Sequence, residues 1–165
     1  KMIAGGDFKE ALARCARAYA AQLGRLCMAL TGSQAEAEEL VQETLIAAYD
    51  AFPSFRFEAP VKSWLYGIAR RICGRHNEVK NRRQARLRLV HDTGRAMDAG
   101  ELSLLRERAV RARTALSALK PSEREAVVLR YDAGLSFREV AFACGVDEAA
   151  ARKRVSRPSF SWGKR

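Results

Sequence analysis

Apolar side chains recur every three or four residues along most of the chain, which is the spacing of amphipathic helices. Asp7 and Glu10 have the spacing of a capping box that would open the first helix, and Gly32 is placed to end it. Its apolar stripe is Phe8, Leu12, Cys15, Tyr19, Leu23, Leu26 and Leu30. Few segments alternate polar and apolar residues as a strand would. The pattern therefore predicts an all-α protein.

Two further helices are predicted before residue 90. Ser33 and Glu36 have capping-box spacing, and the helix that follows would stop at Pro53. Its inward positions are Leu40, Thr44, Leu45, Ala48 and Phe52. After an irregular stretch, Pro60 suits the first turn of a third helix that runs to about Arg88. The inward positions of that helix are Trp64, Leu65, Ile68 and Ile72. We expect these three helices to form one compact domain, residues 1–90.

The remainder of the chain predicts a second small helical domain, residues 104–165. Residues 91–103 contain two glycines and have no sustained apolar period, so they are interpreted as a flexible linker. Ser122 and Glu125 have the spacing of another capping box. The helices expected in this domain span 104–119, 122–131, 137–144 and 147–157. The predicted architecture is two small helical domains on a flexible linker.

The last two helices have the pattern of a helix-turn-helix. Ser136 and Glu139 would cap the first helix, and small Ala141 lies where two helices would cross closely. Gly145 follows four residues later, where the turn requires a positive φ. The outer face of the second helix is Glu148, Ala149, Arg152 and Lys153. Such a helix fits the major groove. The alternative is a helical hairpin with a solvated polar face, and the basic run after position 151 favours DNA binding.

Net charge narrows the choice of partner. The chain has 30 Lys and Arg against 19 Asp and Glu, a net charge of +11, which points to nucleic acid or an anionic membrane surface. No apolar run is long enough to span a bilayer, and no signal-peptide pattern is visible. We therefore expect a cytoplasmic protein without membrane insertion.

The charges are also segregated along the chain. Residues 34–54 carry five acids and no base, whereas residues 62–88 carry nine bases and one acid. This layout suggests two faces, one for a protein partner and one for nucleic acid. Helix-dipole complementarity is the alternative, but it explains the first acids and not a whole basic helix.

Metal binding and catalysis have little support. Cys15, Cys27, Cys73 and Cys144 form no C-x-x-C pair, and the chain has only two histidines. Cys15 and Cys144 are better explained as small buried apolar residues. No cluster of nucleophile, base and orienting group is evident. We expect no cofactor, no metal and no enzymatic activity.

Three segments resemble the sigma-70 family. Residues 36–45, EAEELVQETL, resemble conserved region 2.2, and residues 52–71, FPSFRFEAPVKSWLYGIARR, resemble regions 2.3 and 2.4. Residues 116–131, LSALKPSEREAVVLRY, continued by the helix-turn-helix, resemble region 4. Regions 1.1 and 3 have no room, which implies the extracytoplasmic-function branch. The resemblance implies an alternative sigma factor that binds core RNA polymerase and recognises and melts promoter DNA at its −10 and −35 elements.

The resemblance also implies a role for particular residues. The clamp helices of the polymerase β′ subunit would contact Leu40, Val41, Gln42, Glu43 and Thr44. The −10 element would be bound by Phe55, Arg56, Phe57, Lys62, Trp64, Arg70, Arg71, Arg75, His76 and Asn77. The −35 element would be read by Glu148, Ala149, Arg152 and Lys153, with Arg138 and Arg154 toward the DNA backbone. The polymerase β flap and an anti-sigma factor are further implied partners.

Several alternatives stay open at this point. Phe55 and Phe57 could stack on bases, at about 1–3 kcal/mol per base, whereas core packing is an alternative role for Phe52 and Trp64. The family often has Ser, Gly and Thr where this chain has Asp147, Ala149 and Ala150. The −35 DNA sequence that family members recognise therefore cannot be assigned to this chain.

Two other classes of protein remain possible. One is a stand-alone helix-turn-helix transcriptional regulator, although no dimerisation helix is evident. The other is an RNA-binding or nucleoid-type basic protein, which would bind without sequence preference and with steep salt dependence. Pro158 follows the expected recognition helix, and the role of the tail after it is open.

Overall fold

The computed structural model describes residues 8–88 and 104–156, and every regular element in them is a helix. The first unit contains α1 (Phe8–Thr31), α2 (Gln34–Ala51), the short 3₁₀ helix η2 (Phe52–Ser54) and α3 (Val61–Arg88). The second contains α4 (Leu104–Ser117), α5 (Pro121–Tyr131), α6 (Phe137–Cys144) and α7 (Glu148–Ser156). The all-α prediction is confirmed. The predicted linker, residues 91–103, and the tail after Pro158 lie outside the described residues.

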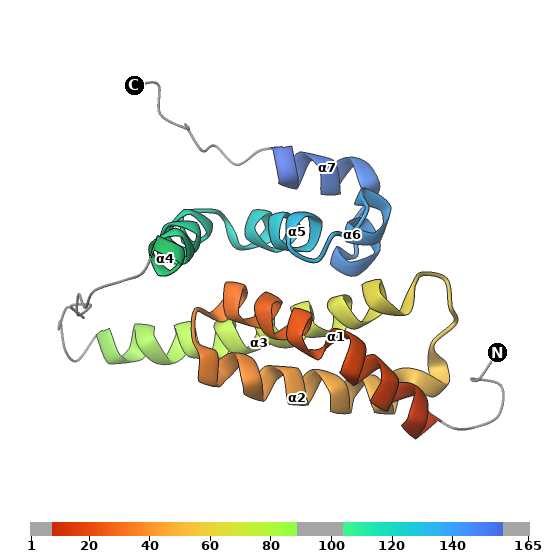
Figure 1. Cartoon of the computed structure of the whole chain (residues 1–165). Coiled ribbons are helices and arrows are strands. Elements are labelled where there is room, and N and C mark those ends of the chain that lie inside the picture. The colour runs from red at the N-terminus through yellow and green to blue at the C-terminus, as the bar shows by residue number, and fades with distance from the viewer. Residues whose placement is uncertain (1–7, 89–103, 157–165) are drawn as a thin grey trace.

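The predicted apolar stripes of α1, α2 and α3 meet in one core. Leu23 and Leu26 of α1 pack with Leu40 of α2 and with Leu65 and Ile72 of α3, and all five are buried. Figure 1 shows α1 and α2 running side by side with the longer α3 against them. Burial of these side chains is the main force that holds the bundle together, at roughly 1.5–3 kcal/mol per large side chain.

The ends of α1 and α2 are fixed partly as predicted. Gly32 has φ +78° and its N–H donates to the Met28 carbonyl at 2.8 Å, which ends α1. Ser33 Oγ accepts the N–H of Glu36 at 3.4 Å. The predicted reciprocal bond is absent from α2, because the Glu36 carboxylate accepts a hydrogen bond from Lys80 of α3 at 2.7 Å. That carboxylate therefore joins two helices.

The start of α5 differs from the prediction. Pro121 is its first residue, where a missing N–H costs nothing. Glu123 accepts the N–H of Lys120 at 3.4 Å, so the predicted pairing of Ser122 with Glu125 is wrong. With Pro121 as the first helical residue, the cap is Lys120, two residues before the serine that was expected to be the cap. Glu125 consequently lies within α5, where its carboxylate faces α3.

The helix-turn-helix forms as predicted. Ser136 Oγ accepts the Glu139 N–H at 3.3 Å, and Glu139 Oε2 accepts the Ser136 N–H at 2.7 Å, a complete capping box. Gly145 ends α6 with φ +65°, a left-handed conformation that suits glycine. Asp147 Oδ1 then accepts the Ala150 N–H at 2.6 Å and caps α7.

The two helical units pack directly on one another. Figure 1 shows α4–α7 above α1–α3, with α6 reaching down to α3. Buried residues of both units, among them Tyr66 of α3 and Val140 of α6, belong to one continuous apolar cluster. The helical spacing of the apolar residues did not predict this contact.

Candidate nucleic-acid interface

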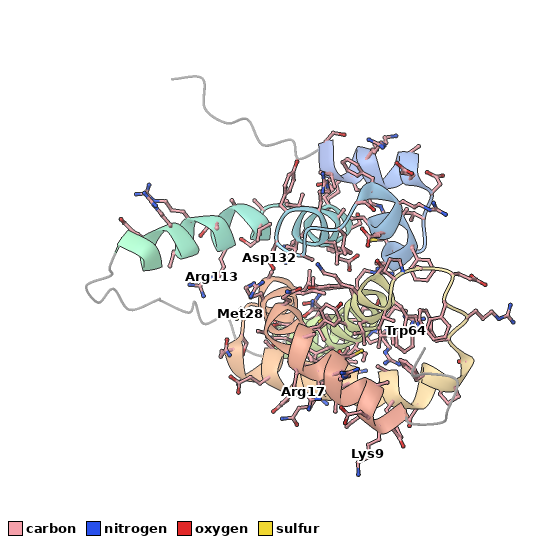
Figure 2. All side chains as sticks on the ribbon, turned by 45° about the vertical axis from the view of Figure 1, so that its right-hand side comes forward. Lys9, Arg17, Met28, Trp64, Arg113 and Asp132 are labelled. Carbon is pink, nitrogen blue, oxygen red and sulfur yellow. The ribbon has the colours of Figure 1, made fainter. Side chains whose placement is uncertain are left out.

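An aromatic cluster forms where the loop after α2 returns to α3. The rings of Phe55 and Trp64 stack, with centroids 4.6 Å apart and an interplanar angle of 26°. Phe57 lies 4.6 Å from Phe55, and buried Phe52 supports the cluster from below, 5.8 Å from Trp64. Figure 2 shows Trp64 close to this loop. Phe52 is therefore a core residue, while Trp64 is half-buried beneath two rings that reach toward solvent.

Phe57 has an unusual backbone for its side chain. Its φ is +58°, in the left-handed region that a bulky residue rarely adopts, and half of its surface is exposed. Neighbouring Arg56 is also exposed. The loop thus presents one aromatic ring and one guanidinium to solvent, which is the combination that can stack on a base and neutralise a phosphate.

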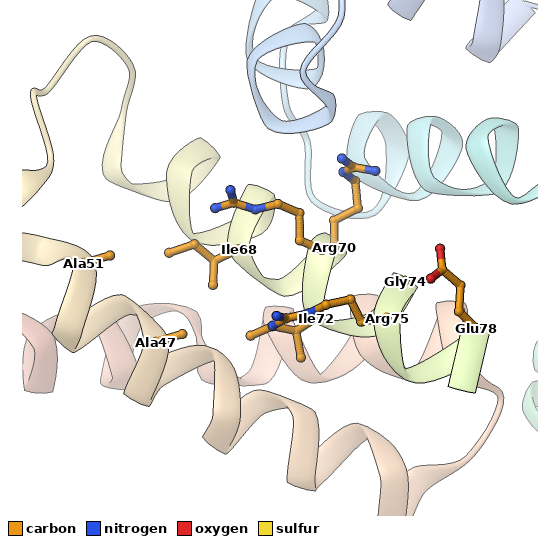
Figure 3. Close-up of a pocket in the computed structure, with 9 residues that line it drawn as sticks. Ala47, Ala51, Ile68, Arg70, Ile72, Gly74, Arg75 and Glu78 are labelled. Carbon is orange, nitrogen blue, oxygen red and sulfur yellow. The ribbon is translucent and has the colours of Figure 1, made fainter. Parts of the chain in front are cut away.

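Two exposed arginines of α3 border a cleft next to α2. Arg71 and Arg75 are one helical turn apart, and the apolar floor of the cleft includes Ala47 of α2 with Ile68 and Ile72 of α3. Figure 3 shows Ile68 and Ile72 directed toward α2. The cleft encloses about 510 Å³. It is large enough for a base, with cations at its rim for a phosphate backbone.

Lys62 and Arg70 of α3 face the other way, toward the second unit. Arg70 Nη1 donates to Glu125 Oε2 of α5 at 2.9 Å, and its other nitrogens donate to carbonyls at the end of α6. Figure 3 shows Arg70 pointing away from the α2 side of α3. Lys62 Nζ donates to the carbonyl of Ala133. Arg70 also lines the cleft beside Arg71 and Arg75, but its guanidinium is bound by the second unit, and Lys62 is not among the residues that line the cleft.

His76 and Asn77 contact their own bundle. Asn77 Nδ2 donates to the Leu30 carbonyl at 3.0 Å, and His76 Nε2 lies 3.4 Å from Glu36 Oε2. The hydrogen bond and positive charge of Lys80 lower the pKa of Glu36, and burial partly opposes that effect. These contacts order the junction of α1, α2 and α3, so His76 and Asn77 have structural roles in this arrangement.

The outer face of α7 is solvent-exposed as predicted. Glu148, Ala149, Arg152 and Lys153 are exposed, Arg138 of α6 is exposed beside them, and Arg154 is half-buried. Ala151 and Val155 are buried beneath.

One arginine on this face is held in place before any ligand binds. Arg152 Nη2 donates to Glu148 Oε1 at 2.6 Å, and its guanidinium lies 4.5 Å from the ring centre of Phe137. Arg130 lies over the same ring at 5.0 Å. The sequence did not indicate this arrangement, because residues 130, 137 and 152 meet only through the fold.

The five α2 residues expected to contact polymerase do not share one face. Leu40 is 3% exposed, and Thr44 is buried with its hydroxyl donating to the Leu40 carbonyl at 2.6 Å. Gln42 and Glu43 are exposed and Val41 is half-buried. The outward face also contains two large apolar residues that the sequence reasoning missed: Ile46, 65% exposed, and Tyr49, 46% exposed. Their spacing from Gln42 by one and two helical turns was the available signal.

All four cysteines are free thiols that are buried or half-buried among the packed helices. Cys144 is buried and Cys15 is half-buried, and burial raises the pKa of both thiols. Cys73 donates to Cys27 with 3.5 Å between the sulfurs, which lowers the pKa of Cys27 and raises that of Cys73. Among the described residues, no three potential metal ligands lie together.

Comparison with known proteins gives the family. Residues 15–84 match the family described as Sigma-70 region 2, and residues 109–157 match Sigma-70, region 4. The ECF RNA polymerase sigma factor SigL of Mycobacterium tuberculosis is 30% identical over 144 residues, covering 83% of this chain and 78% of SigL. The chain belongs to the sigma-70 family, in its ECF branch.

Two other relatives are longer than the segment they share with the chain. ECF sigma factor SigC of Mycobacterium tuberculosis is 31% identical over 124 residues, which are 73% of the chain and 65% of SigC. BldN of Streptomyces coelicolor is 29% identical over 151 residues, 87% of the chain and 55% of BldN. The chain thus spans less than two thirds of these two curated relatives.

Two solved structures share the fold over most of the chain. The sigma factor RpoE of Bartonella quintana, in complex with the anti-sigma factor NepR, superposes with a TM-score of 0.70 at 25% identity and covers 87% of this chain and 89% of its own. CnrH, in complex with the cytosolic domain of CnrY, gives a TM-score of 0.68 at 23% identity over 94% and 86%. Within the described helices of our chain, none has the length and apolarity to cross a bilayer.

Proposed function

We propose that the chain is an alternative sigma factor that brings core RNA polymerase to promoters and itself performs no catalysis. The observation that carries this proposal is the presence, in one ECF-family chain, of two separate cationic surfaces of different construction. One combines aromatic rings with arginines beside a cleft, and the other is the exposed face of a helix-turn-helix. These suit single-stranded and duplex DNA respectively.

The first surface fits a melted −10 element. Extruding a base costs a few kcal/mol, and stacking on Phe57 and Phe55 would return about 1–3 kcal/mol per base. Arg56, Arg71 and Arg75 are exposed for phosphate contacts on either side. Lys62, Trp64 and Arg70 complete the proposed −10 set. Trp64 would support the aromatic rings, and Lys62 and Arg70 would contact DNA once the second unit has moved away. His76 and Asn77 hold the helix that carries them.

The second surface fits the major groove at a −35 element. Glu148, Ala149, Arg152 and Lys153 lie on the exposed side of α7, where its N-terminal residues can reach base edges. Arg138, which is exposed, and Arg154, which is half-buried, are the proposed contacts to phosphate groups. Because Arg152 is already oriented by Phe137 and Glu148, it is the strongest candidate for a direct base contact.

The α2 helix supplies a surface of different chemistry for polymerase. Its exposed side combines acids with Gln42, Ile46 and Tyr49, which suits a protein partner with basic and apolar groups. We propose the β′ clamp helices as that partner and the β flap as the partner of the second unit. RpoE was solved with an anti-sigma factor, which supports a dedicated inhibitor for this chain as well, and a cytoplasmic site of action follows from these partners.

Transcription with purified components tests the proposal. The chain plus core polymerase, on the native genome as template, should give defined 5′ ends that neither component gives alone. A variant with Arg71→Gln and Arg75→Gln should lose these transcripts. Arg111→Gln on α4, which also removes an exposed cation, should keep them. If the chain alone binds duplex sites tightly and polymerase adds no transcripts, the stand-alone regulator is the better explanation.

A further inference from the structure

Two cysteines face each other inside the core of the first unit. Cys27 of α1 and Cys73 of α3, together called the thiol pair below, are fully buried, and their sulfurs lie 3.5 Å apart with Cys73 donating to Cys27. The sulfurs of a disulfide are about 2.05 Å apart, so this bond would require them to approach by roughly 1.5 Å. The two sulfurs are therefore already in contact, and only a small movement separates them from a covalent bond.

Polar contacts on both sides of the thiol pair hold α1 and α3 in register. Tyr66 Oη donates to Gln22 Oε1 at 3.1 Å, and Asn77 Nδ2 donates to the Leu30 carbonyl at 3.0 Å. Both contacts join α1 to α3, and the thiol pair lies between them along each helix. The fold therefore positions the two sulfurs opposite each other before any reaction takes place.

Contact between the sulfurs also gives them different chemical roles. The hydrogen bond from Cys73 lowers the pKa of Cys27, and the same hydrogen bond, together with burial, raises the pKa of Cys73. The thiolate is the form of cysteine that reacts with oxidants. Cys27 is consequently the nucleophile, and Cys73 is the second thiol that closes the bond. Cys15 and Cys144 differ from Cys27, because burial raises the pKa of both.

We propose that Cys27 and Cys73 form a redox-modification site, at which a peroxide converts the two thiols into a disulfide between α1 and α3. In a reducing compartment the thiols are the resting form, and a disulfide there is transient and follows exposure to an oxidant. A dithiol reductant returns the pair to thiols by thiol–disulfide exchange.

The reaction consumes one peroxide and removes two electrons from the sulfurs. The Cys27 thiolate attacks one oxygen of hydrogen peroxide, the O–O bond breaks, and the departing hydroxide takes up a proton and becomes water. Cys73 then attacks the sulfur of the Cys27 sulfenic acid. The S–S bond forms, the S–O bond breaks, and the second hydroxide leaves as water with the Cys73 proton. Two thiols and one hydrogen peroxide thus give one disulfide and two waters.

Access to the buried sulfurs determines the rate of this reaction. Because both sulfurs are fully buried, peroxide reaches them only when the helices open locally. Gly74, which follows Cys73, has no side chain and lines two clefts of about 510 and 590 Å³. These clefts bring solvent to within one residue of Cys73. We therefore expect slow oxidation of the folded chain, on the order of minutes to hours.

The disulfide would make the chain harder to unfold. Cys27 and Cys73 are separated by 46 positions, so a bond between them closes a long loop and removes conformational freedom from the unfolded chain. A loop of this length should raise Tm by on the order of 10 °C. The oxidised chain then keeps α3 fixed against α1 under conditions that unfold the reduced chain.

Peptide mapping identifies the bond directly. The folded chain is treated with hydrogen peroxide, its remaining thiols are blocked with N-ethylmaleimide in urea, and it is digested with trypsin. Because trypsin cleaves after arginine, Cys27 then lies in peptide 26–56 and Cys73 in peptide 72–75. We expect these two peptides to be joined, to be lighter than their sum by two hydrogen atoms, and to separate on addition of dithiothreitol.

Alanine variants show whether the thiol pair is responsible for the change in stability. Cys73→Ala should form no intramolecular disulfide with Cys27 and should show no peroxide-dependent rise in Tm. The matched control carries Cys15→Ala and Cys144→Ala and keeps the thiol pair. It should give the joined peptides and the full rise in Tm.

A disulfide that forms only in the urea-unfolded chain would overturn the proposal, since the fold would then not position the sulfurs. Disulfides of Cys15 or Cys144 that are as frequent as the bond between Cys27 and Cys73 would overturn it too. So would an equal change in Tm on oxidation for the native chain and Cys73→Ala. All of these measurements use the chain alone, so they do not depend on its binding to polymerase or DNA.

Discussion

Alanine substitutions at Leu40 and Gln42 separate the packing role of α2 from its proposed contact with polymerase. Leu40 is 3% exposed, and truncating a buried leucine costs about 2–5 kcal/mol of unfolding free energy. At about 2–4 °C per kcal/mol for a chain of this size, Leu40→Ala should lower Tm by roughly 4–20 °C. Gln42 is exposed, so its truncation should change the unfolding free energy by less than about 0.5 kcal/mol.

Thermal unfolding followed by circular dichroism measures the first effect, and titration with core polymerase at about 10 °C below the lower Tm measures the second. Gln42→Ala, alone or with Ile46→Ala, should weaken polymerase binding without lowering Tm. Folded Leu40→Ala should bind normally. The reasoning is refuted if folded Leu40→Ala loses affinity while the Gln42 and Ile46 variants keep it, because the contact face would then not be the exposed one.

Three further outcomes are expected. Phe57→Ala should weaken binding of single-stranded −10 DNA by about 1–3 kcal/mol, measured by anisotropy. Arg152→Ala should cost about 1–3 kcal/mol for the cognate −35 duplex and less for a scrambled one, measured by competition. Lys80→Met should reduce the unfolding free energy in urea at pH 7, and this reduction should shrink below about pH 4.5, because the lowered pKa of Glu36 makes its contribution disappear as the carboxylate is protonated.

A specific result would contradict each of these three predictions. An unchanged −10 affinity for Phe57→Ala would mean that the ring only covers Phe55. Equal loss on cognate and scrambled duplexes would reduce Arg152 to a phosphate contact. If the Lys80→Met difference were the same at pH 7 and at about pH 3.5, the Glu36 pair would not contribute through its charge.

The helices were predictable because their signals are local. Periodicity located the stripes of α1 to α3, and Ser136 with Glu139 and Gly145 marked the helix-turn-helix by spacing alone. The pairing of Ser122 with Glu125 failed because two local signals competed, and Pro121 determined the start of α5. The contact between α3 and α6 was not predictable, since the residues on either side of it are more than 70 positions apart.

Side-chain roles were harder to predict than helices. A run such as residues 40–44 turns through more than one revolution of a helix, so it cannot face a partner throughout. The resemblance to region 2.2 identified residues 40–44 as the segment that would contact polymerase. Because Leu40 and Thr44 are buried, only the other residues of this segment are available for that contact. For the same reason His76 and Arg75, adjacent in sequence, differ in burial. His76 is half-buried beside Glu36, whereas the side chain of Arg75 is largely exposed and lies 3.8 Å from Glu43 further along α2.

The left-handed backbone at Phe57 limits which residues this position can accept without strain. Glycine or asparagine would hold a φ of +58° with less strain, so substitution toward either should make the fold more stable. A phenylalanine persists there only where its ring has a use that outweighs the strain. Wherever descendants of this chain lose their promoter, this position should be among the first to drift to glycine.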